Sequence, residues 1–489
     1  MSRRKELGRR AFLGGVAALG GAAILSRVGP GRAFATGLSP PAAPRVGRTV
    51  TLHLVAAERA VKLPCLAGRE LPLWTFSESD WLPVIRIDLG DRLLVRLSNR
   101  LPRPGEHTSI HWHGIRLPND QDGVPYLTQE PVEPGEDCSY SFTPPDTGTF
   151  FFHTHCNTAE QLGRGLAGLL IVDGDAVEPY DSDEAIVLRD WRLTENKAGF
   201  LPFYTEEGAV RAGTFGTVRT ANGAVVPEIP LPASGDCRLR VLNIDPARVV
   251  EMGIRGADAA LAAIDGVAIP PVPLRSWRMG PAMRADVVIR APRENETAML
   301  VDYFAPEPVP LARLVGRGAA RRTGAFDPAP LRAGRMPDPD LKDAERLTFE
   351  FTPTATGQAV ARAADSGAAL GALCLANDSF WAINRAAWPG HGAGRIPPPL
   401  AVLQRDRSYI FELVNRTKQQ HPIHIHGHHL KLLKSNKRDL PVHRADTLLL
   451  YPDERIETAF VADNPGNWMF HCHIVEHQES GMMGYVRVL

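Results

Sequence analysis

Residues 90–99, GDRLLVRLSN, contain the pattern that decides the fold. Related segments recur as GDCRLRVLN at residues 235–243 and as RDRSYIFELVN at residues 405–415. Each segment has an Asp near its start, alternates or nearly alternates apolar residues, and ends on Asn. This pattern is typical of a half-buried strand that leads into a turn. The spacing of the segments predicts three similar units of ordinary domain size.

The rest of the chain favours an all-β fold. Its 489 residues exceed what a single core usually serves. Pro (42 residues) and Gly (44 residues) are abundant and convincing helical stretches are few, which favours Greek-key sandwiches of antiparallel strands. We expect the first domain at residues 36–175, the second at 176–305 and the third at 344–489. Residues 306–343, in which Pro, Ala and Arg are prominent, are expected to form a linker.

Residues 1–35 are expected to be an export signal. A basic start is followed by an apolar run of mostly small residues at 12–25, and residues 33–35 supply a small-x-small cleavage site. Residues 9–13, RRAFL, resemble the twin-arginine signal, which would direct the folded protein to the twin-arginine export machinery. The alternative is a membrane anchor, but the apolar run is shorter than the ~20 residues that span a bilayer. We therefore expect an exported protein, periplasmic or secreted, without a stable membrane anchor.

The charge balance argues against a polyanionic partner. Lys+Arg and Asp+Glu both number 55, so the formal net charge is zero. A strongly basic balance is the usual sign of nucleic-acid or anionic-membrane binding. We expect no nucleic-acid partner.

Histidine is concentrated in four His-x-His pairs in the first and third domains. Side chains at positions i and i+2 of a strand point to the same face, so each pair presents two imidazoles together. A single pair could equally be two hydrogen-bonded, half-buried histidines, but four symmetrically placed pairs predict a site for more than one metal ion. No histidine occurs between His155 and His391, so the second domain carries no such pair. The four pairs are His111 with His113, His153 with His155, His424 with His426, and His471 with His473.

The same parity predicts a second, separate centre around Cys472. This cysteine lies between two histidines that share a face, so its side chain points to the opposite face. His421 precedes His424 by an odd offset and should also face away from that pair. With His477 and Met482, these residues supply a thiolate, two imidazoles and a thioether, which is the ligand set of a blue-copper site. The alternatives are a structural zinc site or a buried free thiol.

The first domain supplies an internal control. GTFFFHTH (residues 148–155) aligns with GNWMFHCH (residues 466–473) without a gap. Where the third domain has the four blue-copper ligands, the first has Thr108, Thr154, Ala159 and Arg164. Only the third domain can therefore hold the mononuclear copper, which the chain itself joins to the multi-histidine site through His471 and His473.

Six cysteines occur in the chain: Cys65, Cys138, Cys156, Cys237, Cys374 and Cys472. Export permits disulfides. If Cys472 binds a metal, five cysteines remain, so at least one stays unpaired within the chain. The sequence leaves the pairing open.

Together these motifs resemble the multicopper oxidases of the laccase type. The resemblance covers nearly all of the mature chain and implies three cupredoxin domains, four coppers, one-electron oxidation of a donor at a type 1 copper, and reduction of dioxygen to water at a trinuclear cluster. The motifs that carry it are TSIHWHG, DGVP, GTFFFHTH, LRDW, HPIHIHGHHL, DNPGNWMFHCHIVEH and GMM.

The resemblance also assigns ligands. It implies that His421, Cys472, His477 and Met482 hold the type 1 copper, and that His111 and His424 hold the type 2 copper. One type 3 copper would be held by His113, His153 and His473, and the other by His155, His426 and His471. Asp122, in DGVP, matches a carboxylate that helps to deliver protons to oxygen; the alternative is a turn-forming Asp before Gly123.

One position departs from the family pattern. Similar bacterial enzymes often have a carboxylate six residues after the ligand cysteine, where this chain has Gln478. An amide cannot act as an acid or base near neutral pH. Either Asp122 or water then carries more of the proton delivery, or oxygen reduction is slower.

The donor is less constrained. An axial Met482 should hold the type 1 potential lower than an apolar residue would, which favours electron-rich phenols and aromatic amines. The nearest alternative is a cuprous oxidase, with Cu(I) as donor. Such relatives tend to carry a methionine-rich insert in the third domain, and no Met lies between Met336 and Met469. His428, His429 and His443 are expected to be surface or core-edge groups.

Two alternatives from other classes are weaker. An exported structural or cell-division protein without enzymatic activity would be expected to have lost copper ligands, whereas every ligand position here is filled. Simple copper storage would not need a mononuclear centre joined to a multi-histidine site.

Overall fold

The computed structural model describes residues 38–41, 47–78, 80–365, 379–389 and 396–489. The predicted export signal at residues 1–35, the first residues of the expected first domain and Cys374 lie outside these residues. The described strands form six sheets and the helices are short, which confirms the all-β class. None of the described helices has the length and apolar character needed to cross a bilayer.

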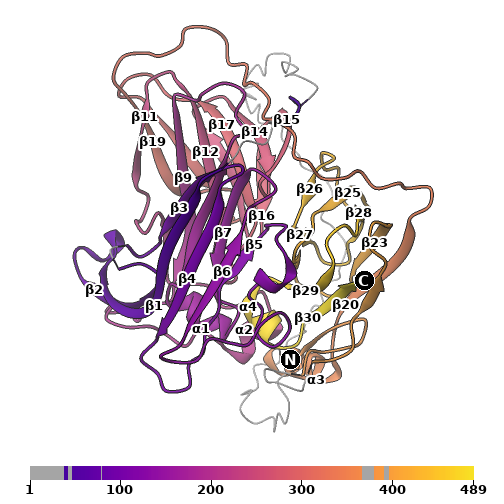
Figure 1. Cartoon of the computed structure of the whole chain (residues 1–489). Helices are drawn as coiled ribbons and strands as arrows, with labels where there is room; N and C mark the ends of the chain where they lie inside the picture. The colour runs from indigo at the N-terminus through magenta and orange to yellow at the C-terminus, as the bar shows by residue number, and fades with distance from the viewer. Residues whose placement is uncertain (1–37, 42–46, 79, 366–378, 390–395) are drawn as a thin grey trace, which may run out of the picture. The chain divides into compact units, whose positions relative to one another are not determined.

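The strands fall into three pairs of sheets along the chain (Figure 1), which we call the first, middle and third units. The first unit, residues 49–173, has one sheet in the order β2-β1-β4-β6 and another in the order β3-β8-β7-β5. Its strands are β1 (Thr49–Lys62), β2 (Glu70–Thr75), β3 (Val84–Asp88), β4 (Arg92–Arg100), β5 (His111–His113), β6 (Asp137–Phe142), β7 (Gly148–His153) and β8 (Ala167–Asp173).

The middle unit, residues 182–317, has sheets in the orders β10-β9-β12-β17-β14-β15 and β11-β19-β18-β13-β16. Its strands are β9 (Ser182–Trp191), β10 (Val218–Ala221), β11 (Glu228–Pro232), β12 (Asp236–Asn243), β13 (Val250–Arg255), β14 (Ala259–Ile264), β15 (Val267–Pro273), β16 (Trp277–Met279), β17 (Arg284–Arg290), β18 (Thr297–Asp302) and β19 (Val309–Arg317).

The third unit, residues 345–488, has sheets in the orders β21-β20-β23-β28-β25-β26 and β22-β30-β29-β24-β27. Its strands are β20 (Glu345–Pro353), β21 (Trp381–Ile383), β22 (Ala401–Leu403), β23 (Ser408–Asn415), β24 (His421–Ile425), β25 (Leu430–Ser435), β26 (Arg444–Ala445), β27 (Thr447–Leu450), β28 (Arg455–Val461), β29 (Gly466–Cys472) and β30 (Met483–Val488). The described helices of the chain are α1 (Thr158–Arg164), α2 (Glu206–Val210), α3 (Ala355–Asp365) and α4 (Val475–Glu479), with 3-10 turns η1 (Pro64–Leu66) and η2 (Asn119–Gln121).

The three repeated sequence segments form equivalent strands. These are β4, β12 and β23, and each pairs in parallel with the first strand of its unit and antiparallel with a later one. The sheets are therefore mixed, not purely antiparallel as expected. Segments such as residues 63–91, between β1 and β4, are long enough to return the chain in the same direction.

The Asn at the end of each repeat has a shared structural role. Asn99, Asn243 and Asn415 are fully buried, and each side-chain carbonyl accepts a hydrogen bond from the backbone N–H two residues later. Each side-chain amide also donates to two backbone carbonyls, for example Asn415 to Gln419 and Tyr451, both at 2.8 Å. The amide satisfies backbone groups that the end of the strand would otherwise leave buried without partners.

The predicted linker at residues 306–343 is wrong in its first part. Residues 309–317 form β19, which lies between β11 and β18 in its sheet. Its Leu311, Leu314 and Val315 are buried. Pro310 hides the strand in the sequence, and the structure accommodates it where the register against β18 shifts between Leu300 and Val301. The expected domain boundaries otherwise stay predictions.

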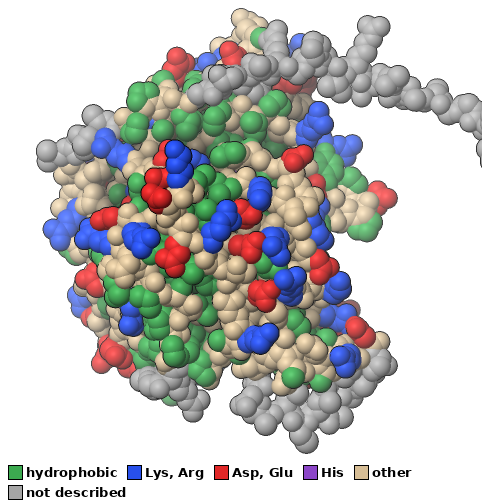
Figure 2. All heavy atoms as spheres, turned by 90° about the vertical axis from the view of Figure 1, so that its right-hand side faces the viewer, with side chains coloured by type: hydrophobic (Ala, Val, Ile, Leu, Met, Phe, Trp, Pro, Cys, Tyr) green, Lys and Arg blue, Asp and Glu red, His purple; other side chains and the backbone are tan. Residues whose placement is uncertain are grey.

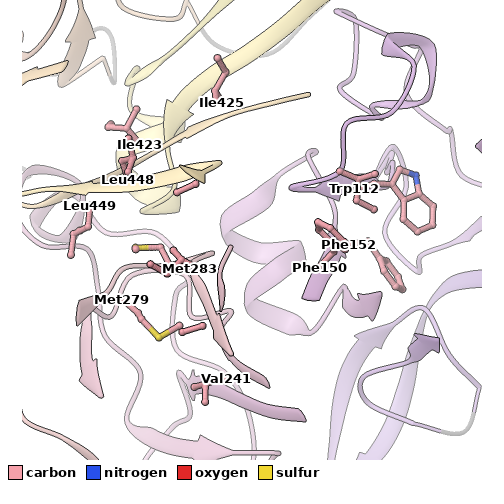
Figure 3. Packing of buried hydrophobic residues seen from close by; sticks show 14 of the residues in the cluster. Trp112, Phe150, Phe152, Val241, Met279, Met283, Ile423, Ile425, Leu448 and Leu449 are labelled. Atoms are coloured by element: carbon pink, nitrogen blue, oxygen red, sulfur yellow. The ribbon is translucent and has the colours of Figure 1, made fainter. Parts of the chain in front are cut away.

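Apolar side chains between paired sheets also orient the histidines. In the first unit Trp112, Phe150 and Phe152 pack together (Figure 3), with 5.2 Å between the ring centroids of Trp112 and Phe152. Because alternate side chains of a strand face opposite sides, burying Trp112 and Phe152 in this core turns His111 and His153 away from it. The core thus places the imidazoles on the face opposite the packed rings.

Acidic and basic side chains are interspersed on the face shown in Figure 2. Exposed ion pairs of the molecule include Arg416 with Glu350 and Lys418 with Asp453. This mixture agrees with the zero formal net charge.

Candidate metal centres

Strand pairing brings the histidine pairs together in the same way in two units. In the first unit β5 pairs with β7 so that His111 lies opposite His153. In the third unit β24 pairs with β29 so that His424 lies opposite His471. The two units therefore present the same arrangement of imidazoles.

All eight predicted histidines of the multi-histidine site meet between these two units. They are buried, and stacked imidazoles from different units, His111 with His426 and His113 with His424, have ring centroids 3.7 Å apart. Three groups have ligand atoms within 4.8 Å of one another: His111, His113 and His424; His113, His153 and His473; and His155, His426 and His471. The last two are the sets that the resemblance implied for the type 3 coppers, and the first contains the implied type 2 pair.

The hydrogen bonds of these imidazoles leave acceptor nitrogens facing inward. Nδ1 of His153 donates to the Thr154 carbonyl at 2.8 Å, and Nδ1 of His471 donates to the Cys472 carbonyl at 2.9 Å. The proton is then on Nδ1 and Nε2 carries the lone pair. Nε2 of His471 lies 3.2 Å from Nε2 of His426. Two lone pairs this close in a buried site are unfavourable unless a cation lies between them, so the residues fit a metal cluster.

The remaining nitrogens support the same fit. Nε2 of His111, His155 and His424 is buried without a hydrogen-bond partner. His113 has the reverse orientation: its Nε2 is bonded to a carboxylate oxygen of Asp446 at 3.0 Å, and its Nδ1 has no partner. Burial, the largest cause, and the neighbouring imidazoles lower the pKa of His155 well below its ordinary value. His155 is therefore held neutral, the form of imidazole that binds metals.

Cys472 lies at the separate centre that parity predicted. Its Sγ is 3.6 Å from Nδ1 of His421 and 3.6 Å from Nδ1 of His477, and these two nitrogens are 3.1 Å apart. Nε2 of His477 donates to the Arg211 carbonyl at 2.6 Å, so its Nδ1 is the acceptor. Burial raises the pKa of the Cys472 thiol, so a bound metal ion would be needed to hold it as a thiolate. Met482 is buried, and its backbone carbonyl accepts a hydrogen bond from the Cys472 N–H at 3.0 Å.

Asp122 contacts two of the predicted copper ligands. One carboxylate oxygen is 2.8 Å from Nδ1 of His426, and the other is 3.2 Å from Nδ1 of His111. Asp122 also precedes Gly123, whose φ of 79° requires the left-handed region. The residue therefore forms the expected turn and orients two imidazoles as well.

Sequence reasoning missed a second carboxylate, Asp446. It is buried and bonds Nε2 of His113, and it lies 3.3 Å from Nδ1 of His424. Arg284 of the middle unit donates to both of its oxygens, at 2.9 and 2.6 Å. Although burial alone would raise it, Arg284 and His113 hold the pKa of Asp446 well below its ordinary value. No spacing rule marks this pair, because the two residues lie 162 positions apart.

Asp265 of the middle unit completes this contact. Its carboxylate accepts hydrogen bonds from the backbone N–H groups of Arg284 at 2.8 Å and Thr447 at 3.1 Å. Burial and the nearby Asp446 raise the pKa of Asp265 to about 7, against the opposing effect of Arg284. The middle unit thus reaches the multi-histidine site without supplying a histidine.

Other residues singled out in the sequence are also buried. Gln478 lies in α4, and its Nε2 has no partner. His428, His429 and His443 are 2–5% exposed, so the expectation of surface or core-edge groups is wrong. Aromatic rings explain part of this burial: Phe460 and Trp468 contact His428, and Trp277 contacts His443.

The five cysteines within the described residues are all free.

Comparison with known proteins agrees with this arrangement. Two family models described as multicopper oxidase match residues 60–177 and 376–489. The chain is 30% identical over 482 residues to multicopper oxidase MmcO of Mycobacterium tuberculosis, covering 90% of this chain and 87% of that protein. It is 27% identical to Laccase-1 of Botryotinia fuckeliana, over 85% of this chain and 78% of that one.

Solved structures give the same picture. A multi-copper oxidase from Pseudomonas thermotolerans superposes with a TM-score of 0.80 at 35% identity, covering 91% of this chain and all of that one. A multicopper oxidase from Campylobacter jejuni, described as a metallo-oxidase, superposes with a TM-score of 0.74 at 25% identity, covering 93% of this chain and 96% of that one. The cupredoxin-like class of the three expected sandwiches is confirmed by these neighbours.

Proposed function

Because this chain belongs to the multicopper oxidase family, an oxidoreductase family that uses copper and dioxygen, we propose that it is a laccase-type enzyme. Its donors are electron-rich phenols or aromatic amines. When bound, the four coppers supply one-electron oxidation of four donor molecules and the reduction of one dioxygen, with four protons, to two waters. Residues 1–35 support export through the twin-arginine machinery, to the periplasm or the outside.

One observation carries the proposal. Two separate sets of candidate metal ligands are joined by three consecutive residues, His471, Cys472 and His473. Cys472 faces His421 and His477, whereas the flanking His471 and His473 face the eight-imidazole site. The type 1 ligands are then His421, Cys472, His477 and Met482, and the eight paired histidines hold the type 2 and type 3 coppers as the resemblance implied. A storage or structural protein would have no need of this connection.

Two buried carboxylates fix the orientation of four of the imidazoles. Asp122 fixes the protonated nitrogens of His111 and His426, and Asp446 fixes those of His113 and His424. Such partners set the tautomer and direction of each metal-binding nitrogen. We propose that Asp122 also delivers protons to oxygen. The carboxylate that often does so in similar enzymes lies six residues after the ligand cysteine, and this chain has Gln478 at that position.

A cuprous-oxidase function is the second candidate, favoured by the neighbour described as a metallo-oxidase. Oxygen uptake by the copper-loaded mature protein separates the two. The test gives an electron-rich phenol together with a Cu(I) chelator, and uses Cys472→Ser as control. We expect uptake by the wild type and none by the variant. Uptake with Cu(I) alone would establish the cuprous oxidase, and uptake with neither donor would reopen the structural alternative.

A further inference from the structure

The two imidazoles at the type 1 centre are closed to solvent. His421 and His477 are both 0% exposed. The outer nitrogen of His477 is bonded to the Arg211 carbonyl of the middle unit, and the outer nitrogen of His421 lies 2.8 Å from the Thr417 hydroxyl. A donor therefore cannot reach either imidazole edge directly, and its electron must cross a residue that covers them.

Trp381 is the aromatic residue in this cover. Its ring centroid lies 5.2 Å from that of His421 and 5.0 Å from that of His477. The indole N–H donates to the Ala209 carbonyl in α2 at 2.5 Å, which fixes the ring between the middle and third units. Trp381 as a whole residue is 4% exposed.

Trp381 borders a cavity of about 260 Å³. Its wall includes Trp381, Arg211 and Thr417, each of which contacts a type 1 imidazole, and residues of α3 such as Ala361. Neither this cavity nor one of about 330 Å³ that is lined by Trp277 and His443 has a predicted copper ligand among its described lining residues. The cavity at Trp381 is placed to deliver electrons because residues of its wall contact the type 1 imidazoles.

The lining of this cavity favours an organic donor over a cuprous ion. Among the described lining residues there is no Cys, Met or His, which are the ligands that Cu(I) prefers. The described lining residues include four cationic side chains and one carboxylate, that of Asp365, so their net positive charge would repel a metal cation. The volume lies below the ~300 Å³ at which pockets for drug-sized ligands begin, so it suits a donor with a single ring.

We propose that a single-ring aromatic donor binds in this cavity against Trp381, and that the indole is the route by which its electron reaches the type 1 copper. The inference rests on the laccase-type function proposed above and goes beyond it in assigning the donor site. Each donor would lose one electron, which the indole would pass toward the residues that would hold the type 1 copper, and one proton, which would pass to water at the open side of the cavity. Trp381 itself is not consumed, because it begins and ends in the same redox state.

The test compares Trp381→Leu with Trp381→Phe. Electron transfer falls steeply with distance, so removing the ring should slow the reduction of the type 1 copper by 2,6-dimethoxyphenol at least about tenfold, whereas Phe should restore most of the rate. The blue absorption band should be retained, since Trp381 is not a ligand, and the measured type 1 potential allows the rate to be corrected for any change in driving force. Phe304→Leu, an exposed aromatic residue outside the cavity, is the matched control. A wild-type reduction rate in Trp381→Leu would overturn the proposal.

Ala361→Phe tests the cavity without altering Trp381. The larger side chain should fill the space and lower the apparent affinity for the phenol, raising KM more than it lowers kcat. Calorimetric titration with 1,3-dimethoxybenzene, which has no phenolic hydroxyl to lose, should show binding to the wild type and at least about tenfold weaker binding to Ala361→Phe. Equal binding by both proteins would place the donor elsewhere. If the wild type oxidises no phenol at all, the proposed function fails. If the wild type oxidises phenols and the Trp381 and Ala361 variants do so equally well, only this inference fails.

Discussion

In the third unit, the Cys472 sulfur lies 3.6 Å from the Nδ1 atoms of His421 and of His477, and these two nitrogens are 3.1 Å apart. At the equivalent place in the first unit, the hydroxyls of Thr108 and Thr154 both donate to the Gln161 side-chain carbonyl, at 2.8 and 2.6 Å. The two sites are similarly buried and occupy aligned positions in the sequences of the two units. What separates a metal centre from a polar core network here is the balance of donors and acceptors.

The first-unit network is complete in itself. The amide of Gln161 donates to Glu106 at 2.7 Å and to the His107 carbonyl at 2.8 Å. Buried polar groups that satisfy one another stabilise a fold and leave no lone pairs directed at a common point. In the third unit, by contrast, the Cys472 sulfur and the two Nδ1 atoms converge closely enough for one cation to bind all three.

The largest effect is expected from giving the third unit the residue of the first. Cys472→Thr removes the thiolate, so we expect loss of the blue absorption band and a fall in phenol-driven oxygen uptake of about a thousandfold or more. Absorption spectra and oxygen uptake measure both. The reciprocal change, Thr154→Cys, should create no blue band, because Thr108 and Ala159 stand where imidazoles would be needed. A second blue centre in that variant would contradict the comparison.

A smaller effect is expected from breaking the first-unit network. Gln161→Leu leaves Glu106 and the two threonine hydroxyls without their shared partner, which should lower the free energy of unfolding by about 1–3 kcal/mol. Copper content and the blue band should be unchanged. Denaturant unfolding and copper analysis test this, with the exposed Gln404→Leu as control, for which the change should stay within about 0.5 kcal/mol. Loss of blue copper in Gln161→Leu would show that the two sites are not independent.

The smallest effect is expected at an aligned position where the first unit has a carboxylic acid and the third unit has an amide. Six residues after Thr154 the first unit has Glu160, and six after Cys472 the third has Gln478. Gln478→Glu introduces a group that can carry a proton, so reoxidation by dioxygen should become about two to five times faster in stopped-flow experiments. Gln478→Leu should give no increase. An unchanged or slower reoxidation in the Glu variant would count against a role for this position.

Strand periodicity explains why so much of the candidate site could be predicted. The imidazole pairs, the opposite direction of Cys472 and the different chemistry of Thr108 all depend on local alternation, which the sequence contains in full. The resemblance then divided the eight histidines into sets that the structure brings together.

Contacts between units could not be predicted in this way. Arg284 and Asp446 carry no local pattern, and only the packing of the middle unit against the third makes them partners. Pro310 concealed β19 because its fit depends on a shifted register with β18, which is a property of two strands and not of one. The burial of His428 and His443 depends likewise on aromatic rings that lie far away in the sequence.

The contact between Arg284 and Asp446 limits how this protein can be rebuilt from modules. A shortened enzyme without residues 182–317, or a chimera with another middle unit, would leave the Asp446 carboxylate buried without its cation. Losing one partner of a buried ion pair typically costs about 3–5 kcal/mol. A graft would therefore have to bring its own guanidinium to this point, so the unit without histidines is not an exchangeable spacer.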